Sequence, residues 1–313
     1  MASRAGMMPL VVRELRRETP SIVSIRLEDA QGAPLPRWEA GSHLDIQLIT
    51  RQERQYSLCG DPDDERGYRI AVKLEPLSRG GSHYIHRFLR VGSTVWARPP
   101  RNHFALQDAP SYLLLAVGIG ITPILSMARH LEAAGADWRM LYLARTEDDV
   151  AFRSEIDALG SRARVHLSAV DGRIDLDELT AGLAEGTEVY TCGPQGFIDA
   201  LIELRDRRPE LSINLERFEP IAREYRPDEE FEVYCSGSDL VVTVPADRSM
   251  LQALQGAGVA VSGSCLRGIC GSCALQVLDG MPEHRDSLNT DDSSTTVYPC
   301  VSRSLSPRLT VDA

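Results

Sequence analysis

Three cysteines stand within nine residues near the C-terminal end of the chain, and they constrain the fold more than any other feature. Cys265, Cys270 and Cys273 have the spacing C-x4-C-x2-C, and Cys300 follows 27 positions after Cys273. Glycines in and beside this run allow the backbone to curl tightly, because glycine tolerates positive φ and has no Cβ. The pattern is that of a [2Fe–2S] cluster held by four cysteine thiolates.

A zinc site and a disulfide framework are the two alternatives. Structural zinc sites usually pair two C-x2–4-C units, whereas Cys300 stands alone in the sequence. The chain has seven cysteines, an odd number, and we expect no secretory signal because its first ten residues contain no long apolar stretch. Both observations argue against disulfides. We therefore expect Cys265, Cys270, Cys273 and Cys300 to be iron ligands.

The 313-residue chain is long enough for two further domains. From Leu10 to Leu106, short β-like runs are broken by glycine, proline and aspartate, which predicts a small antiparallel β-barrel. From Ser111 onward, apolar strands alternate with helical segments, which predicts an α/β domain with a parallel sheet. Residues 219–230 are rich in proline, arginine and acid and are expected to form a linker. The expected domains are the barrel at residues 1–108, the α/β domain at 109–222 and an α+β domain at 228–313.

The same patterns predict the element boundaries. We expect strands at residues 21–27, 43–49, 54–58, 68–74, 93–97, 111–117, 138–144, 164–169, 188–192, 212–216, 231–235 and 240–244. We expect helices at residues 83–89, 150–159, 176–183, 194–205 and 250–256, and one that follows residues 118–123 and runs to about residue 134.

A glycine turn follows the predicted strand 111–117 and opens the next helix. Its sequence is Gly118-Ile-Gly120-Ile-Thr122-Pro123. Proline suits the first helical turn, where its missing N–H costs nothing, and the other N–H groups of such a turn can bind phosphate. Alternatively, the glycines only allow tight packing.

A second turn, Cys192-Gly193-Pro194, ends a later predicted strand and opens another helix. In open α/β sheets, ligands bind at the carboxyl ends of strands, and both turns lie at such ends. The two turns together indicate a dinucleotide site, although Cys192 by itself is also compatible with a small buried thiol.

The segment Arg54-Gln-Tyr56-Ser57 lies on a predicted barrel strand, and a Ser-Arg-Gly-Gly-Ser turn follows at residues 78–82. A flavin requires an aromatic wall, a hydrogen bond near its N5 atom, and cationic and hydroxyl donors for phosphate. Arg54, Tyr56, Ser57 and Ser82 can supply these groups. The same residues also fit an ordinary strand with a surface arginine.

The order of these motifs resembles one family. Residues 231–313 resemble a plant-type ferredoxin domain, an α+β β-grasp fold, and the glycine turn with Cys192-Gly193-Pro194 resembles the pyridine-nucleotide domain of the ferredoxin–NADP reductase superfamily. From about residue 12 to residue 311, the chain resembles the phthalate dioxygenase reductase and vanillate O-demethylase reductase family.

The resemblance implies that NADH reduces FMN, and that electrons then pass singly through the [2Fe–2S] cluster to a Rieske-type terminal oxygenase. Ser57 near flavin N5, Cys192 beside the nicotinamide and Phe218 stacked on the flavin are the implied catalytic residues. The implied cofactor-binding residues are Arg54, Tyr56 and Ser57 at the isoalloxazine and its chain; Arg79, Gly81 and Ser82 at the FMN phosphate; Ala71 and Lys73 in a family segment; and Gly118, Gly120, Thr122, Cys192 and Gly193 around the nicotinamide. His43, His83 and His86 are expected to have only structural roles.

Composition limits the partners. The net charge is −11, which disfavours general nucleic-acid binding. From residue 228 to the end, 12 acidic residues stand against 5 arginines; this acidic end can steer a basic partner or can simply be a solvated surface. The sequence contains no run of 18 or more apolar residues, so no membrane span is predicted. We expect a cytoplasmic monomer.

Several points stay open in the sequence. The partner can instead be a haem-thiolate monooxygenase. A remote alternative is a redox sensor, whose cluster would respond to oxidant and pass no electrons to a partner enzyme. The choice between NADH and NADPH is also open. Arg145, after a predicted strand, can pair with a 2′-phosphate, but Glu147 and Asp171 lie near strand ends too.

Overall fold

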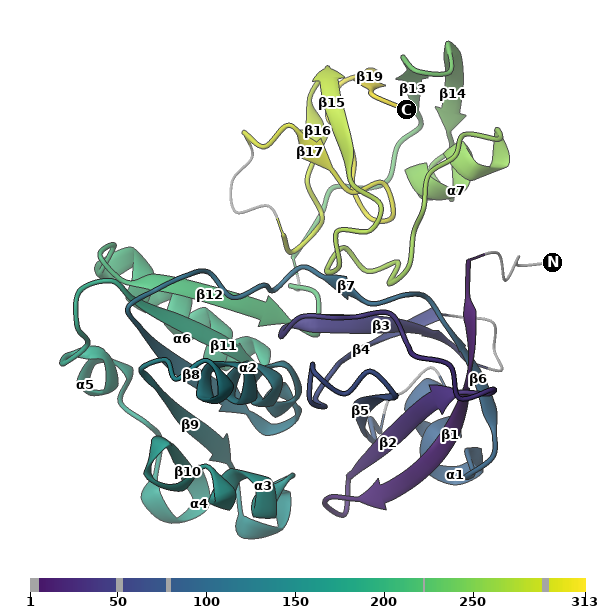
Figure 1. Ribbon diagram of the computed structural model, residues 1–313. Helices are drawn as coiled ribbons and strands as arrows, with labels where there is room; N and C mark the ends of the chain where they lie inside the picture. The colour runs from purple at the N-terminus through teal and green to yellow at the C-terminus, as the bar shows by residue number, and fades with distance from the viewer. Residues whose placement is uncertain (1–5, 49–52, 77–79, 222, 289–292) are drawn as a thin grey trace. The chain divides into compact units, whose positions relative to one another are not determined.

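The computed structural model describes residues 6–48, 53–76, 80–221, 223–288 and 293–313. The chain forms two compact units, Met1–Phe218 and Glu219–Ala313. The first contains an antiparallel sheet and a parallel sheet, and the second contains a mixed sheet (Figure 1). The predicted multidomain fold is therefore confirmed, whereas the three expected domain boundaries remain predictions.

The antiparallel sheet is a barrel. Its strands follow the order β4-β3-β6-β1-β2-β5, with β7 paired to β3. An isolated bridge between Leu58 and Ile70 joins the two ends of this order. The elements are β1 (Met8–Arg17), β2 (Ile22–Asp29), β3 (Ser42–Gln47), β4 (Glu53–Ser57), β5 (Gly67–Lys73), α1 (Gly81–Phe88), β6 (Thr94–Ala97) and β7 (Arg101–Asn102).

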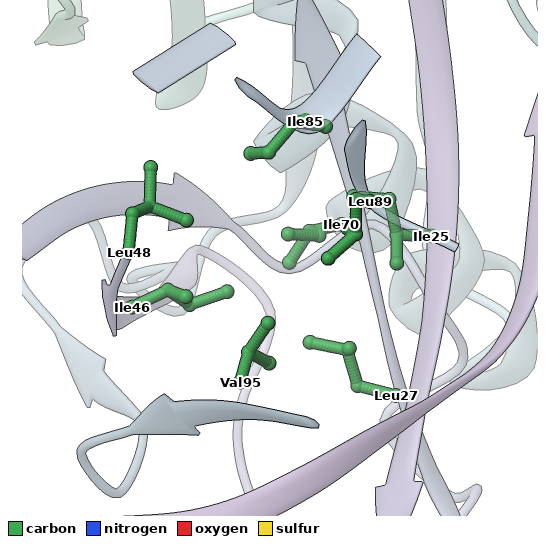
Figure 2. Close-up of a pocket in the computed structure, with 8 residues that line it drawn as sticks. All are labelled: Ile25, Leu27, Ile46, Leu48, Ile70, Ile85, Leu89 and Val95. Carbon is green, nitrogen blue, oxygen red and sulfur yellow. The ribbon is translucent and has the colours of Figure 1, made fainter. Parts of the chain in front are cut away.

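The inside of the barrel is aliphatic. Figure 2 shows the side chains that line a small pocket there, namely Ile25, Leu27, Ile46, Leu48, Ile70, Ile85, Leu89 and Val95. Because none of these eight side chains has a polar group to orient a ligand, the pocket belongs to the core. Full burial of each contributes about 1.5–3 kcal/mol to stability.

Strand β1 was not among the predicted strands. Its sequence, MPLVVRELRR, carries four charged residues in its second half, and its pairing with β2 is irregular between Val12 and Glu14. A bulge of this kind shifts the side chains to opposite faces, so it interrupts the alternation on which strand prediction depends.

The parallel sheet has the order β10-β9-β8-β11-β12, a doubly wound arrangement with a switch point between β8 and β11. Helices α2 and α3 pack on one face of the sheet, and α5 and α6 pack on the other. The elements are β8 (Ser111–Val117), α2 (Ile121–Ala133), β9 (Trp138–Ala144), α3 (Arg153–Ala158), β10 (Ala163–Leu167), α4 (Ser168–Asp171), α5 (Leu176–Thr180), β11 (Thr187–Gly193), α6 (Gln195–Arg207) and β12 (Ser212–Arg217).

Strand β10 ends at Leu167, two residues before its predicted end. The Asp171 carboxylate accepts a hydrogen bond from the Leu167 N–H at 3.0 Å, and residues 168–171 form a helical turn. Such a side-chain acceptor competes with the strand ladder for the backbone donor. The predicted extension of this strand to Ala169 is therefore wrong.

The second unit holds a mixed sheet in the order β14-β13-β19-β15-β17, with a small β16–β18 pair. Ser249 is the N-cap of helix α7. Its hydroxyl accepts a hydrogen bond from the Gln252 N–H at 3.2 Å, and the Gln252 side chain accepts one from the Ser249 N–H at 3.0 Å. This capping box sets the start of the helix. The elements are β13 (Phe231–Cys235), β14 (Leu240–Val244), α7 (Met250–Gly256), β15 (Leu275–Asp279), β16 (Pro282–Glu283), β17 (Thr296–Val297), β18 (Arg303–Ser304) and β19 (Arg308–Val311).

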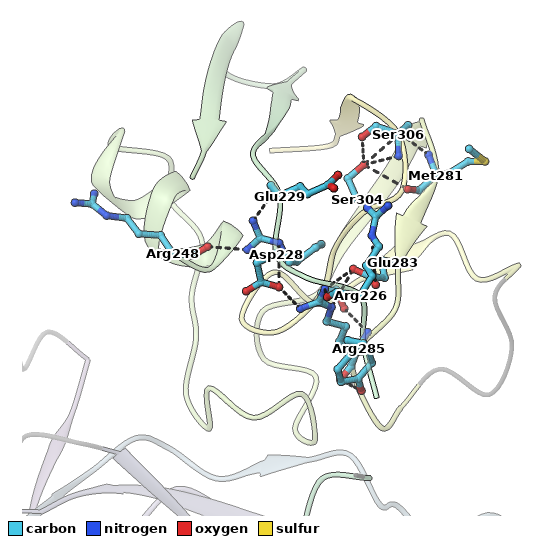
Figure 3. A network of polar contacts seen from close by, with 12 residues as sticks. Arg226, Asp228, Glu229, Arg248, Met281, Glu283, Arg285, Ser304 and Ser306 are labelled. Atoms are coloured by element: carbon cyan, nitrogen blue, oxygen red, sulfur yellow. Dashed lines mark hydrogen bonds and ion pairs between the residues drawn. The ribbon is translucent and has the colours of Figure 1, made fainter. Parts of the chain in front are cut away.

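The described residues of the predicted linker, 219–221 and 223–230, have no regular secondary structure, but part of this segment is bound to the second unit (Figure 3). Arg285 donates to the Asp228 carboxylate at 2.6 Å and to the Arg226 carbonyl at 3.2 Å. Arg303 donates to the Glu229 carbonyl at 2.7 Å. The side chains of Arg285 and Arg303 are only 11% and 5% exposed, so residues 226–229 form part of this unit's surface and are not a free tether.

In the part of the chain that the structure describes, no helix has both the length and the apolar character needed to span a membrane.

Candidate functional site

The two glycine-containing turns of the nucleotide domain meet at the carboxyl edge of the parallel sheet. Strands β8 and β11 are parallel neighbours, with Cys192 opposite Ala116. A Cβ added to Gly120 would overlap the carbonyl of Cys192. Position 120 must therefore be glycine, because only then can the turn that opens α2 lie this close to β11. This close approach brings together the two strand ends that border the switch point, where ligands bind in such sheets.

Thr122 lies in this turn but its hydroxyl is engaged within the turn. It donates to the Ile119 carbonyl at 3.0 Å, and the residue is 2% exposed. Its implied contact with the nicotinamide remains a prediction, and its observed contact stabilises the turn.

The barrel strand β4 carries the candidate flavin residues. Ser57 pairs with His43 of β3 and is buried, and Tyr56 packs against the barrel core. The Arg54 side chain lies beside Gly81, the first residue of α1, with 3.6 Å between a Cβ built on Gly81 and Arg54 Nε. The first N–H groups of a helix and a guanidinium together suit a phosphate group.

Other candidate flavin residues divide into different environments. Ser82 is buried, and its hydroxyl accepts from the Glu75 N–H at 3.1 Å. Lys73 is exposed, with Nζ 3.5 Å from Glu75 Oε1, and Ala71 is buried in the core. Arg79 lies outside the described residues.

Glu216 is a site residue that the sequence analysis missed. It stands on β12 directly opposite Cys192 of β11. Burial raises the pKa of its carboxyl to about 8, and a hydrogen bond from the Ser57 hydroxyl partly opposes that rise. At neutral pH the carboxyl is therefore mainly the uncharged acid. The available signal was the position of Glu216 near the carboxyl end of a predicted strand of the parallel sheet, where ligands bind.

One buried polar atom at this point, Glu216 Oε2, has no hydrogen-bond partner among the described residues. Because buried polar groups in native proteins are nearly always paired, such an atom needs an explanation, and a bound ligand is one. Burial, with Glu216 as a second cause, raises the pKa of the neighbouring Cys192 thiol well above its usual range, so this side chain stays an uncharged thiol.

Phe218 follows the end of β12 and packs, partly buried, against the core that the barrel and the parallel sheet share. This core contains Ala40, Cys59 and Ala71 of the barrel together with Ile121 and Ile124 of α2. The barrel and the nucleotide domain thus form one compact unit, and Ser57, Cys192 and Glu216 lie where they join.

His43, His83 and His86 have contacts that fit structural roles. Burial lowers the pKa of His43 to about 4, so this imidazole is neutral, and it lies 3.1 Å from Gln55 Nε2. His83 and His86 contact the carbonyls of Glu75 and Val72 at 3.1 and 2.9 Å.

The residues considered for nicotinamide choice lie at the exposed edge of the nucleotide domain. Arg145 is exposed after β9, and Glu147 is paired with Arg153 at 2.5 Å. Asp171 accepts from the Leu167 N–H.

The four candidate iron ligands form two pairs in the second unit. A hydrogen bond between Cys265 and Cys270 lowers the pKa of the Cys270 thiol and raises that of Cys265. A hydrogen bond between Cys273 and Cys300 likewise lowers the pKa of Cys273 and raises that of Cys300.

Two pairs of thiols suit a two-iron cluster, which needs one pair for each iron. Among the described residues, which include all four cysteines, no three His, Cys, Asp or Glu side chains are grouped closely enough to bind one metal ion. Gly268, at φ +68°, completes the loop, since a Cβ there would lie 2.9 Å from the Asp286 Cα.

Comparison with known proteins gives the family. The chain is 36% identical to the vanillate O-demethylase oxidoreductase of Pseudomonas sp. (strain HR199 / DSM 7063), over 98% of this chain and 100% of that protein. This chain belongs to the phthalate dioxygenase reductase and vanillate O-demethylase reductase family. Family models for an oxidoreductase NAD-binding domain and a 2Fe-2S iron-sulfur cluster binding domain match residues 114–202 and 233–304.

Further matches extend over almost the full chain. The solved structure of phthalate dioxygenase reductase, described as a modular structure for electron transfer from pyridine nucleotides to [2Fe–2S], is 36% identical with a TM-score of 0.75, covering 99% of this chain and 98% of that one. The chain is therefore an oxidoreductase, and the expected FMN, NADH and [2Fe–2S] cofactors are confirmed.

Two other matches have haem-containing systems in their names. The haem-dependent oxidative N-demethylase beta subunit of Ectopseudomonas mendocina (strain ymp) is 38% identical, over 96% of this chain and 97% of that protein. An intact type IV self-sufficient cytochrome P450 monooxygenase is 38% identical with a TM-score of 0.88; the match covers 99% of this chain but only 41% of that longer one. The chain is thus similar to reductases of oxygenase systems of more than one kind.

Proposed function

We propose that this chain is the reductase component of a Rieske-type aromatic oxygenase or O-demethylase system. It carries electrons from NADH through FMN and the [2Fe–2S] cluster to the partner oxygenase. The observation that carries the proposal is the meeting of Ser57, Cys192 and Glu216 where the barrel joins the nucleotide domain, with the buried Glu216 Oε2 left without a protein partner among the described residues.

Bound FMN supplies the ability to accept two electrons as a hydride and to release them one at a time. The protein residues position and shield this chemistry. Arg54 and the N-terminus of α1 would hold the phosphate, which their proximity supports. The turn at Gly120 and the end of β11 would hold the nicotinamide, because hydride transfer needs close approach of the reacting atoms.

Ser57, Glu216 and Cys192 add no charge to the reacting centre at neutral pH. Glu216 holds a proton because burial raises its pKa, so its acid O–H can donate to the Ser57 oxygen. The single Ser57 O–H is then free to donate toward flavin N5. Cys192 is a small, fully buried thiol that limits water access. Phe218, which follows β12 and packs against the shared core, would stack on the flavin. These assignments require positioning and a dry site, and they need no acid–base triad.

The test is an anaerobic absorbance spectrum of the purified protein before and after NADH addition. We expect flavin bands with a broad brown shoulder, both of which bleach with NADH, and release of the flavin should yield FMN. Steady NADH-dependent reduction of cytochrome c is also expected, and its absence would favour the redox sensor. A colourless protein that contains zinc would refute electron transfer altogether.

The Rieske partner is favoured over the haem partner by the vanillate O-demethylase and phthalate dioxygenase reductase matches. The N-demethylase and P450 matches favour the alternative, a haem-containing monooxygenase. Reconstitution decides between them. The reductase should support product formation by a Rieske-type demethylase at a rate near that of the demethylase's own reductase, and it should support a haem-thiolate monooxygenase poorly; the reverse ranking overturns the Rieske assignment.

A further inference from the structure

One carboxylate joins the barrel to the nucleotide domain at a point away from the cofactor-binding turns. Glu155, on α3, accepts two hydrogen bonds from Arg69 of the barrel strand β5, at 2.7 Å on Oε1 and 2.8 Å on Oε2. Arg129 of α2 also donates to Glu155 Oε2. A carboxylate held in this bidentate way has a defined direction as well as a strong contact.

The same two guanidiniums hold the backbone that follows the flavin strand. The Cys59 carbonyl accepts from Arg69 Nη2 at 2.9 Å and from Arg129 Nη1 at 2.5 Å. The Gly60 carbonyl accepts from Arg129 Nη1 at 2.8 Å. Cys59 is two residues after Ser57, so the contacts bear directly on the strand that presents Ser57 to the site.

The surroundings keep this cluster in place. Phe152, the residue before α3, has φ 57° and is 1% exposed, and the Arg69 guanidinium lies 5.0 Å from the centre of its ring. The side chains of Arg69, Glu155 and Arg129 are each only 22–25% exposed. Burial, followed by the nearby Arg69 charge, lowers the pKa of Arg129 to about 10.

Glu155 is the only carboxylate that the described contacts place against both cations. Without it, two half-buried guanidiniums would face each other with only carbonyl partners. The expected response is a local rearrangement that shifts the Cys59 backbone, because an unpaired buried charge is costly.

We propose that Glu155 is a positioning residue for hydride transfer. Its contacts with Arg69 and Arg129, which we call the latch, hold the barrel strand that carries Ser57 against the nucleotide domain that carries Cys192 and Glu216. The latch thereby keeps the two halves of the site at reacting distance. This proposal rests on the proposed function. Because a displacement of about 1 Å can slow a reaction on the order of 100-fold, loss of the latch should act on the rate of the hydride step more than on the binding of either cofactor.

The test compares Glu155→Gln with Asp157→Asn in the full-length, cofactor-loaded protein. Asp157 lies on the same helix and pairs with Arg153 at 3.0 Å, but its side chain is 58% exposed and its ion pair stays within the helix. Anaerobic stopped-flow mixing with NADH measures the limiting rate of flavin reduction and the apparent Kd for NADH.

For Glu155→Gln we expect the limiting rate to fall on the order of 10-fold or more, with FMN content unchanged and the apparent Kd for NADH within about twofold of wild type. Asp157→Asn should match wild type. If the limiting rate of flavin reduction in Glu155→Gln equals that in Asp157→Asn, the proposal is overturned. It is also overturned if the rate is slower only because Glu155→Gln has lost FMN.

A second variant covers failure of Glu155→Gln to fold. Arg69→Lys keeps the positive charge but cannot donate from one fork to both Glu155 and the Cys59 carbonyl. It should show the same selective loss of rate, and a wild-type rate overturns the proposal. Failure of the proposed function looks different. A haem partner in place of the Rieske partner would change the ranking in reconstitution and leave these flavin-reduction rates as they are, and absence of electron transfer altogether would leave the wild-type flavin unreduced by NADH.

Discussion

Glu216→Gln should remove a pH dependence of folding stability that the wild-type carboxyl imposes. Burial raises the pKa of Glu216 from its ordinary value of 4.5 to about 8. The folded state therefore binds this proton more tightly than the unfolded state does. The associated stability is fully present below pH 4.5 and is lost as the pH rises through 8. At about 1.36 kcal/mol per pKa unit, the loss is about 3 kcal/mol by pH 7 and about 5 kcal/mol above pH 8.

These magnitudes are upper limits, because Glu216 is only part-buried as a whole although its Oε2 atom is buried. Glutamine keeps the size of the side chain and stays neutral at every pH. The free energy of unfolding of Glu216→Gln minus that of wild type should thus increase by several kcal/mol between pH 5 and pH 9.

Denaturant unfolding followed by tryptophan fluorescence measures this difference. All three tryptophans, Trp38, Trp96 and Trp138, lie in the unit Met1–Phe218, so the signal reports the part of the chain that contains Glu216. Glu203→Gln is the matched control, because Glu203 is exposed on α6, and it should follow wild type across the pH range. A stability difference between Glu216→Gln and wild type that does not change with pH would refute the reasoning.

Three further results are expected. Cys270→Ser should lose the cluster absorbance yet keep NADH-dependent ferricyanide reduction, since ferricyanide takes electrons from the flavin directly; loss of both would contradict the assigned division of labour. Arg54→Ala should weaken FMN binding about 10-fold or more, measured by flavin retention on dialysis, and full retention at low FMN concentration would count against its role. Arg285→Ala should release the clamped part of the linker and speed chymotrypsin cleavage at Tyr225, whereas Arg308→Ala, which breaks an exposed pair, should not; equal cleavage rates would show that the clamp is weak.

Many element positions could be predicted because their signals are local. Ser111–Val117 and Trp138–Ala144 are apolar runs with clear limits, and the structure has them with the predicted bounds. Helix Met250–Gly256 also has its predicted bounds, since its capping box lies within four residues of sequence. Strand β1 was missed because a bulge interrupts its alternation, and β10 was extended too far because the Asp171 acceptor was not recognised.

Local sequence motifs predicted the classes of cofactor, namely an iron–sulfur cluster, a nicotinamide dinucleotide and a flavin. The cysteine spacing, the two glycine turns and the Arg54–Ser57 segment each require only a few adjacent residues, so their chemistry can be inferred without knowing how distant segments pack. The tertiary structure alone decided which of these segments meet. Glu216 faces Ser57 only because β12 pairs with β11 and the barrel packs against that sheet, and Arg69 meets Glu155 across 86 positions of sequence. Periodicity and composition indicate that a residue is buried but not against what, since strand neighbours and domain contacts are set by packing over the whole unit.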